Sequence, residues 1–314
     1  MLDIIGKKNY YFLFSLLVII PGLISLALWG LRLSIDFTGG SSITLLFQKP
    51  VTQETKSKVK TVFSKDGVQV ATMQVAGKSL IVRTPPLSEK RDADILKKLK
   101  PVVGSFTQDD FQTIGPTIGK EITLNAFKAV FLAAILIVLY IAWSFRKVPK
   151  PASSWRFGIT AIIAMMHDLL VVVGIFSILG HFFGVEVDSL FVTAILTVVG
   201  FSVHDTIVVY DRIRENLLRV SSVSFDQVVN DSILQTMTRS LNTSLTAMLV
   251  LFTLLIFGGE STRWFVLALL IGIASGTYSS IFNASPLLVV WHDWRLKHPR
   301  KASAPQKPTK KPWE

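Results

Sequence analysis

Residues 189–210 read SLFVTAILTVVGFSVHDTIVVY, and this stretch sets the class of fold. His204 and Asp205 are its only residues of the His, Asp, Glu, Lys and Arg group. A helix needs about 20 predominantly apolar residues to cross the hydrocarbon core of a bilayer, so this stretch is long enough. Five other stretches meet the same criterion. We therefore expect six transmembrane helices, over residues 10–31, 124–145, 157–179, 189–210, 241–257 and 264–290.

The composition of the 314 residues is typical of a polytopic α-helical membrane protein. Hydrophobic residues make up 50% of the chain and charged residues 17%, with a mean hydropathy of +0.49. A soluble domain carries about 25% charged residues. These figures exclude a disordered chain, a collagen and a coiled coil. Cysteine is absent, which excludes disulfides, a thiolate nucleophile and zinc–cysteine sites.

The distribution of Lys and Arg predicts the orientation of the helices. The connections 180–188 and 258–263 together contain a single basic residue, Arg263. The alternate connections are strongly basic. These basic segments are 146–156, 211–239 and the end of the chain after residue 290. Because short basic loops stay in the cytoplasm, we expect both termini there and residues 32–122 outside. The first apolar stretch is longer than that of a signal peptide and lacks a clear cleavage site, so it is expected to remain as an anchor.

The net charge of +12 raises the question of nucleic-acid binding. Lys and Arg beside membrane spans commonly fix topology and contact lipid headgroups. We therefore interpret the charge as a membrane-surface feature and predict no specific nucleic-acid site. Residues 291–314 hold seven basic residues and several prolines, which predicts a basic, disordered cytoplasmic tail.

Residues 32–122 predict a small α/β domain outside the cytoplasm. Strands are expected over 42–47, 68–75, 80–84 and 105–114, and helices over 52–65 and 88–103. Thr52 and Ser88 are suitable N-caps for the two helices. The order βαββαβ is the split-βαβ arrangement. The segment has no His, no Cys and no P-loop, so a binding or gripping domain and a passive lid both fit.

Ionisable side chains inside the spans require an explanation, because Asp or Lys at mid-helix costs about 2.5–3.5 kcal/mol on insertion scales. Asp205 lies in the fourth span. Arg239 opens the fifth, followed on the same helical face by Asn242, Thr243 and Thr246. Asp205 can exchange a proton, whereas Arg239 stays charged and can hold Asp205 as a carboxylate. The pair fits a proton gate, and it fits a static buried ion pair equally well.

His167 and Asp168 form a second ionisable pair, near the middle of the third span. Adjacent helical residues point about 100° apart, so the two cannot form one site alone. Hydrogen bonding across the bundle is favoured over a secondary proton relay. Asp168 and Asp205 are the only deep acidic pair, and no flanking signature of an aspartyl protease accompanies them. We expect no enzyme activity, no metal site and no cofactor.

Two further patterns predict how helices pack. Gly272 and Gly276 have the G-x-x-x-G spacing that lets another helix approach closely. Ser224 and Gln227 resemble a capping box. The apolar residues after this box predict a cytoplasmic helix between the fourth and fifth spans, at the membrane interface. They are Phe225, Val228, Val229 and Ile233.

Several motifs occur in a recognisable order along the spans. They are IDFTGG at 35–40, DT at 205–206 leading to YDRIREN at 210–216, RSLNTS at 239–244, GG at 258–259, GTYSS at 276–280 and ASP at 284–286. In this combination the chain resembles the SecF family, whose members are subunits of the bacterial SecD–SecF protein-export complex. That family is related to the RND transporter superfamily. The match covers all six predicted spans.

The resemblance implies a subunit that pairs with SecD, here a separate chain, and assists SecYEG-dependent translocation of unfolded polypeptides with the proton-motive force. YajC and YidC are further implied partners. The implied location is the cell (plasma or inner) membrane, with the thylakoid membrane as an alternative. Asp205 and Arg239 match proton-pathway positions of the family, and His204 and Asn242 are assigned to the same pathway.

The sequence departs from the family pattern at two positions. Ser34 stands where Gly often precedes Ile-Asp, and His204 stands where Asn is common. A titratable His204 beside Asp205 can alter the proton chemistry. Two alternative functions stay open. The first is a structural scaffold for SecD without a proton carrier, and the second is an independent RND-like exporter of small molecules or lipids.

Overall fold

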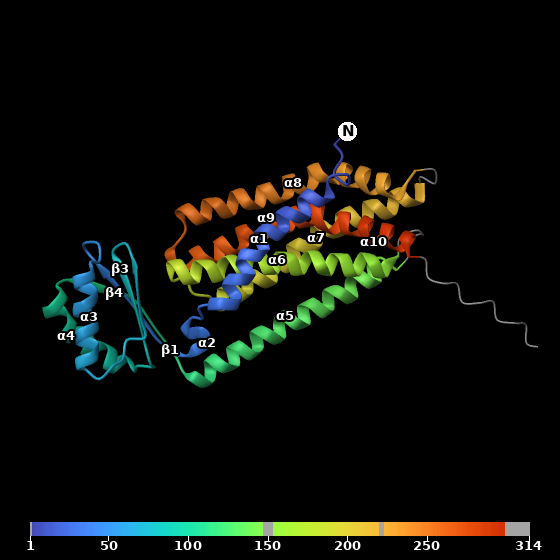
Figure 1. Cartoon of the computed structure of the whole chain (residues 1–314). Coiled ribbons are helices and arrows are strands. Elements are labelled where there is room, and N and C mark those ends of the chain that lie inside the picture. The colour runs from blue at the N-terminus through green and yellow to red at the C-terminus, as the bar shows by residue number, and fades with distance from the viewer. Residues whose placement is uncertain (1, 147–152, 220–222, 299–314) are drawn as a thin grey trace, which may run out of the picture.

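The computed structural model describes residues 2–146, 153–219 and 223–298 (Figure 1). The six predicted spans are confirmed in this part of the chain, where six helices are long and apolar enough to cross a membrane. Five are α1 (Lys8–Trp29), α5 (Pro116–Ser144), α6 (Ser154–Phe183), α7 (Ser189–Arg219) and α8 (Phe225–Phe257). The sixth runs from α9 (Arg263–Ser279) through a π-helical turn (Ser280–Ala284) into α10 (Ser285–Lys297).

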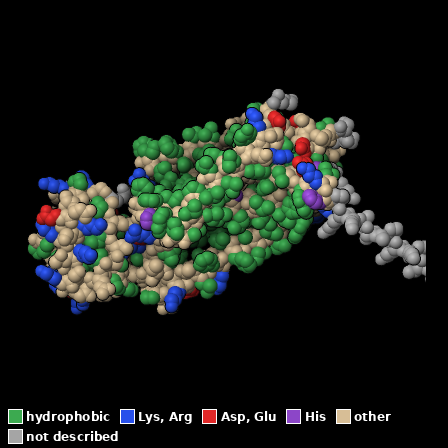
Figure 2. All heavy atoms as spheres, in the orientation of Figure 1, with side chains coloured by type: hydrophobic (Ala, Val, Ile, Leu, Met, Phe, Trp, Pro, Cys, Tyr) green, Lys and Arg blue, Asp and Glu red, His purple; other side chains and the backbone are tan. Residues whose placement is uncertain are grey.

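The helices lie side by side in an elongated bundle, and a small sheet domain stands beyond one end (Figure 1). Apolar side chains cover the visible flank of the bundle, whereas Lys and Arg gather at its ends and on the sheet domain (Figure 2). Helix α5 shows the pattern most clearly, since Phe127, Phe131 and Leu139 are all exposed. An exposed apolar flank of this extent is what a lipid-facing surface requires.

Helix α1 packs closely against α6. An added Cβ on Gly22 would stand 2.8 Å from the Cα of Gly174, so the two backbones touch and leave no room for a side chain. Nearby, the hydroxyls of Ser25 and Ser177 lie 2.8 Å apart. Ser177 also donates to the carbonyl of Gly30 at the end of α1. Small and hydroxylated residues at a close crossing are the usual means of helix association in membranes.

The helix predicted between the fourth and fifth spans is not an element of its own, because it forms the first part of the long helix α8. Helix α8 runs without interruption for 33 residues, about 50 Å at 1.5 Å per residue, because no Gly or Pro between 225 and 257 ends it. Ser224 does cap its start, accepting from the backbone N–H of Gln227. The apolar residues after the cap are all buried: Phe225, Val228, Val229 and Ile233.

The basic segments are also more helical than expected. Residues 211–219 belong to α7, and 291–297 belong to α10. Residues 299–314 of the predicted disordered tail lie outside the described residues, as do 147–152 of the basic segment after α5.

The sheet domain has the predicted βαββαβ order. Its elements are β1 (Gly40–Phe47), α3 (Gln53–Lys65), β2 (Thr72–Ala76), β3 (Ser79–Thr84), α4 (Glu89–Val103) and β4 (Phe106–Ile114). The strands form one antiparallel sheet in the order β2-β3-β1-β4. Thr52 and Ser88 cap the two helices as predicted. The second strand starts later than predicted, because Val68 turns into the core below the sheet.

The chain entering the sheet domain is attached to the start of α7. Leu33 and Val187 form a short parallel bridge. The short helix α2 (Ile35–Thr38) follows, and its Asp36 accepts from the backbone N–H of Ser189 at 2.9 Å and from its hydroxyl at 2.6 Å. These bonds therefore couple the position of this end of α7 to the position of the segment that enters β1.

The sheet itself makes a second attachment, to the loop between α6 and α7. Arg83 on β3 forms an ion pair with Glu186 of the loop, and Arg32 approaches the same carboxylate at 3.6 Å. Gln74 on β2 donates to the carbonyl of Gly184. Burial raises the pKa of Glu186, and the two arginines oppose that rise. The face of the sheet away from α3 and α4 thus contacts the α6–α7 loop through polar side chains.

The pH dependence of the sheet domain is expected to depend on Asp92 of α4. Asp92 is 4% exposed; Gln108 donates to its Oδ2 at 2.7 Å, but its Oδ1 is buried without a partner. Burial therefore raises the pKa of Asp92, so the folded domain binds this proton more tightly than the unfolded chain. The resulting stability is present below the unfolded pKa of about 3.9 and is lost as the pH rises through the folded pKa.

We predict that Asp92→Asn stabilises the domain at pH 7 by about 1 kcal/mol, near the lower cost of a buried unpaired acceptor. The gain should vanish near pH 4. Hydrogen exchange of the β4 amides in the full chain measures it, with the exposed Asp94→Asn as control. Equal gains at both pH values would contradict the argument.

Candidate functional site

Asp205 lies on α7 and is only 6% exposed. Its Oδ2 accepts from the hydroxyl of Ser244 on α8 at 3.2 Å and lies 3.5 Å from the hydroxyl of Thr277 on α9. Thr277 also approaches Ser244, at 2.6 Å. The carboxyl group is therefore enclosed by three helices and contacts neutral hydroxyls, which can donate or accept.

Arg239 is not part of this enclosure. No ion pair among the described residues joins Arg239 to Asp205, so the static ion pair within the chain is not formed. Arg239 lies on an exposed face of α8, together with Asn242, Thr243 and Thr246. The common face predicted for this polar stripe is observed, and it points away from the rest of the chain.

His204 is exposed on α7, the helix packed against α8. Thr193 and Thr197 share the exposed side of α7 with it. The four residues assigned to the proton pathway are therefore divided. Asp205 lies inside the bundle, while His204, Arg239 and Asn242 lie on outward faces of two neighbouring helices.

Among the described side chains of the bundle, Asp168 has the most hydrogen-bond partners. The residue types in the sequence did not indicate this. It is fully buried. Its Oδ2 accepts from Ser202 and from Ser279, each at 2.6 Å. Its Oδ1 accepts from Ser275 at 2.7 Å and lies 2.9 Å from Nδ1 of His167. Hydrogen-bond partners thus surround both oxygens of this buried carboxyl group.

The expectation that His167 and Asp168 point apart needs correction, because their side chains turn back into contact. The expectation that Asp168 bonds across the bundle describes it well. A signal was available in the sequence: Ser275 and Ser279 are four residues apart, so they face one side of a helix. The Nε2 atom of His167 is buried without a partner among the described residues.

Helix α9 connects the two buried acids. Ser275 and Ser279 bind Asp168, while Thr277, between them in sequence, faces Asp205. The π-helical turn follows directly, and the hydroxyl of its Ser280 lies 2.9 Å from that of Thr206 on α7. One short segment of α9 is therefore held against α6 by one acid and against α7 and α8 by the other.

The glycines of the predicted small-residue face lie where α9 meets α7. A Cβ on Gly272 would stand 2.1 Å from a methyl group of Val198. A Cβ on Gly276 would stand 3.1 Å from the Cα of Ser202, which donates to Asp168. The absence of side chains at these positions is what lets Ser202 reach the buried acid.

No cluster of three or more His, Cys, Asp or Glu residues that could hold a metal ion occurs within residues 2–146, 153–219 and 223–298. The bundle site is therefore a set of carboxyl and hydroxyl groups, a chemistry suited to proton exchange and hydrogen bonding.

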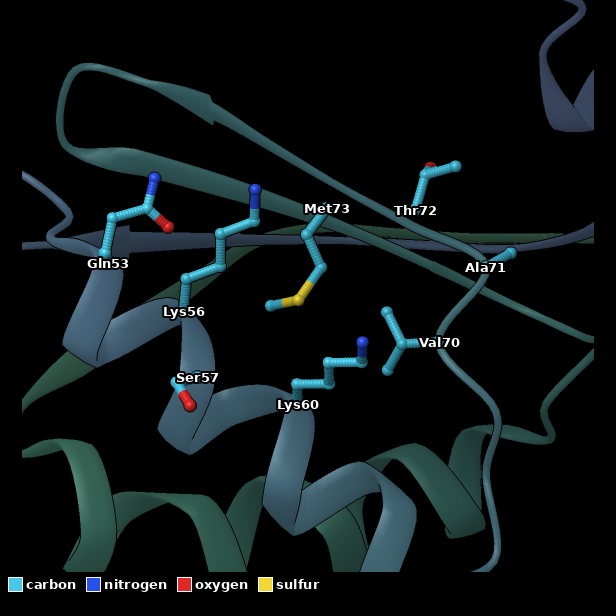
Figure 3. Close-up of a pocket in the computed structure, with 8 residues that line it drawn as sticks. All are labelled: Gln53, Lys56, Ser57, Lys60, Val70, Ala71, Thr72 and Met73. Carbon is cyan, nitrogen blue, oxygen red and sulfur yellow. The ribbon is translucent and has the colours of Figure 1, made fainter.

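The sheet domain carries a hollow of about 300 Å³ between α3 and the edge strand β2 (Figure 3). Val70 and Met73 form its apolar part, and the chains of Lys56 and Lys60 extend over it from α3 (Figure 3). None of its lining residues is acidic. Because β2 lies at the edge of the sheet and, in the described part of the chain, pairs with β3 alone, its other edge can accept a further strand.

Comparison with known proteins decides the family. A model described as "Protein export membrane protein SecD/SecF, C-terminal" matches residues 94–294, and one described as "SecD/SecF GG Motif" matches residues 24–51. The chain belongs to the SecD/SecF protein-export family. The SecD/SecF domain includes every membrane helix after α1, and therefore Asp168, Asp205 and Arg239.

Curated relatives from this family align with most of the length of the chain. The protein translocase subunit SecF of Thermobaculum terrenum is 50% identical over 306 residues, which cover 93% of this chain and 95% of that protein. The SecF of Anaerolinea thermophila is 43% identical over 94% of this chain and 96% of its own length. The SecDF of Thermus thermophilus is 39% identical over 85% of this chain, but over only 35% of that longer protein.

Solved structures of SecDF share the fold. The crystal structure of SecDF, a translocon-associated membrane protein from Thermus thermophilus, matches with a TM-score of 0.81 at 34% identity, covering 93% of this chain. A structure of SecDF in a super-membrane-facing form matches with a TM-score of 0.66 at 36% identity, covering 94%. The chain spans 39% of each SecDF chain. As a SecD/SecF family member, it is a multi-pass membrane component of Sec-pathway protein export.

The bonding of Asp168 predicts a specific stability effect. Ser279→Ala removes one donor from a buried carboxyl group, so we expect the free energy of unfolding to fall by about 1–3 kcal/mol. Thr253→Ala is the control, because exposed Thr253 donates only to a carbonyl of its own helix. Thermal unfolding of the purified chain in detergent compares the two. Equal effects would show that Asp168 does not hold α9.

The α7–α9 contact predicts a paired effect. Gly272→Ala places a methyl group against Val198 and should destabilise the protein by about 1–3 kcal/mol through overpacking. Val198→Ala in the same chain removes the obstructing methyl groups and should recover part of the loss. The double-mutant cycle, measured by thermal unfolding, tests the contact directly. Additive effects would contradict it.

Proposed function

We propose that this chain is the SecF half of a SecD–SecF pair that uses the proton-motive force to assist SecYEG-dependent translocation. In this proposal Asp205 takes up and releases the proton. The supporting observation is its enclosure by hydroxyl groups rather than by a fixed cation. A hydroxyl can donate to the carboxylate or accept from the protonated acid, so the site can bond both protonation states.

SecD covers the outward polar faces of α7 and α8 in this proposal. Polar side chains facing lipid in a span are costly, and His204, Arg239 and Asn242 are exposed in the chain alone. The SecDF relatives contain, in one polypeptide, a matching portion and a longer remainder. A separate SecD placed against these faces would bring its own residues close to Asp205 and complete the pathway.

The attachment of the sheet domain supports transmission of movement from Asp205. Helix α7 carries Asp205 and begins at Ser189, which Asp36 of the sheet-domain entrance binds twice. Arg83 of the sheet and Glu186 before α7 add an ion pair. A shift of α7 on protonation would therefore move β1 and β3 with it. The open edge of β2 and the adjoining hollow offer an extended polypeptide a place to pair as a further strand.

The distribution of Lys and Arg supports cytoplasmic termini and an outer sheet domain, which corresponds to the plasma or inner membrane of a bacterium. Family resemblance adds YajC and YidC as further partners of the complex. A scaffold role for SecD, without proton transfer by Asp205, is the second candidate function, and the same experiment separates the two.

We predict that Asp205→Asn abolishes the proton-motive increment of export while the SecD pairing persists. Asn keeps the size of Asp and one acceptor oxygen, but it cannot take up or release a proton near neutral pH. The measurement is export of a secretory reporter into inverted vesicles, with and without a proton-motive force, after copurification with SecD is verified. Asp211→Asn is the matched control, because exposed Asp211 pairs with Arg214 at 2.7 Å on the same helix. An unchanged increment in Asp205→Asn would leave the scaffold role.

A further inference from the structure

Arg156 is an unusual charge at the end of the bundle opposite the sheet domain, where α5 ends, α6 begins and α10 ends (Figure 1). It is the third residue of α6 and is only 9% exposed. It directly precedes the fully buried Phe157, a member of the main core of the bundle. A guanidinium in such a place normally has a carboxylate partner.

No such partner occurs in the described part of the chain. None of the ion pairs or side-chain hydrogen bonds there involves the Arg156 guanidinium, and its Nε atom is buried without a partner. Asp293 on α10, an acid at the same end, is paired with Lys8 at 3.4 Å. The charged side chain nearest in electrostatic effect is another cation, Arg295, on helix α10, which packs against α6.

The backbone adds to this positive field. Helix α6 has no acidic residue in its first turn, and the side chain of its N-cap, Ser153, makes no capping bond. Unpaired N–H groups at a helix start attract anions, as does the positive end of the helix dipole. With no acid between them, the two guanidiniums and the positive start of the helix repel one another. An anion bound among them would offset this repulsion.

The depth of the site in the membrane identifies the anion. Trp143, Trp155 and Trp294 are 63%, 71% and 58% exposed around this end of the bundle. The guanidinium of Arg146 lies 4.8 Å from the centre of the Trp143 ring. Exposed Trp and Arg side chains gather at the level of the lipid headgroups. The anionic group present at that level is the phosphate of a phospholipid, which a guanidinium binds through two parallel hydrogen bonds.

We propose that Arg156 and Arg295 bind the phosphate of an anionic phospholipid between the start of α6 and the end of α10. The lipid supplies the counter-charge that the chain lacks, and its acyl chains lie along the exposed apolar flank. This site is separate from Asp205 and does not depend on the proposed proton pathway. It links α6, which carries Asp168, to the surrounding membrane.

The test uses the full chain purified in a neutral detergent and titrated with short-chain phosphatidylglycerol or phosphatidylcholine while thermal unfolding is followed. We expect phosphatidylglycerol to raise the unfolding temperature with an apparent affinity at least tenfold tighter than phosphatidylcholine. Arg156→Gln and Arg295→Gln should each reduce that affinity about tenfold, and Arg156→Lys should retain part of it. Because Arg295 is exposed, its variant tests the site even if Arg156→Gln fails to fold.

Arg263→Gln is the matched control, since Arg263 is an exposed arginine in the first turn of α9, a different helix start. Its affinity for phosphatidylglycerol should equal that of the wild type. A further arm titrates inorganic phosphate alone. Equal stabilisation by inorganic phosphate would assign the site to a free anion and overturn the lipid proposal. Equal affinities for the two lipids, or an unchanged affinity in Arg295→Gln, would overturn it as well.

Discussion

The bonding of the Asp168 carboxyl group constrains the arrangement of the bundle. A polar group in the interior of a membrane protein must be hydrogen-bonded within the protein, because no water is available to solvate it. Asp168 meets this requirement with three serine hydroxyls from two other helices and with the adjacent His167. Since the serines are short, α7 and α9 must come close to α6 at this level, and the glycines of α9 are what permit that approach.

This fixed acid gives Asp205 its surroundings. The segment of α9 that binds Asp168 also presents Thr277 to Asp205, so one acid positions a hydroxyl for the other. The two acids differ in how fully they are bonded. Donors fill both oxygens of Asp168, whereas Asp205 has two longer contacts to hydroxyls. The dense bonding of Asp168 fits a group that holds α6, α7 and α9 together, whereas the proton exchange that we propose belongs to the more loosely bonded Asp205.

Much of the fold could be predicted from the sequence. The six spans, the βαββαβ order and the caps at Thr52, Ser88 and Ser224 depend on local pattern and hydropathy, and local pattern persists in the structure. The start of β2 and the continuity of α8 could not be predicted in the same way. Val68 is apolar enough for a strand but turns into the core, and residues 225–239 look amphipathic because one side of α8 is buried there.

The candidate site was less predictable, because it depends on which helices face one another. Arg239 and Asp205 suggested a pair by chemistry, yet their side chains point to different surroundings. The three serines around Asp168 come from positions 34 to 111 residues away in sequence, and no single helix reveals them together. Only the spacing of Ser275 and Ser279 gave a local indication of the site.

The outward polar faces of α7 and α8 are best understood as one half of a site rather than as a defect of the fold. The apolar flank of α5 shows what this chain presents to lipid, with large aliphatic and aromatic side chains. The neighbouring helices α7 and α8 differ, because they expose the polar side chains of His204, Arg239 and Asn242. A membrane chain tolerates exposed polar groups at this depth only where protein or water covers them. In our proposal, the division of Asp205 from His204, Arg239 and Asn242 reflects a site shared by two chains, in which the buried acid belongs to one chain and the other completes its surroundings.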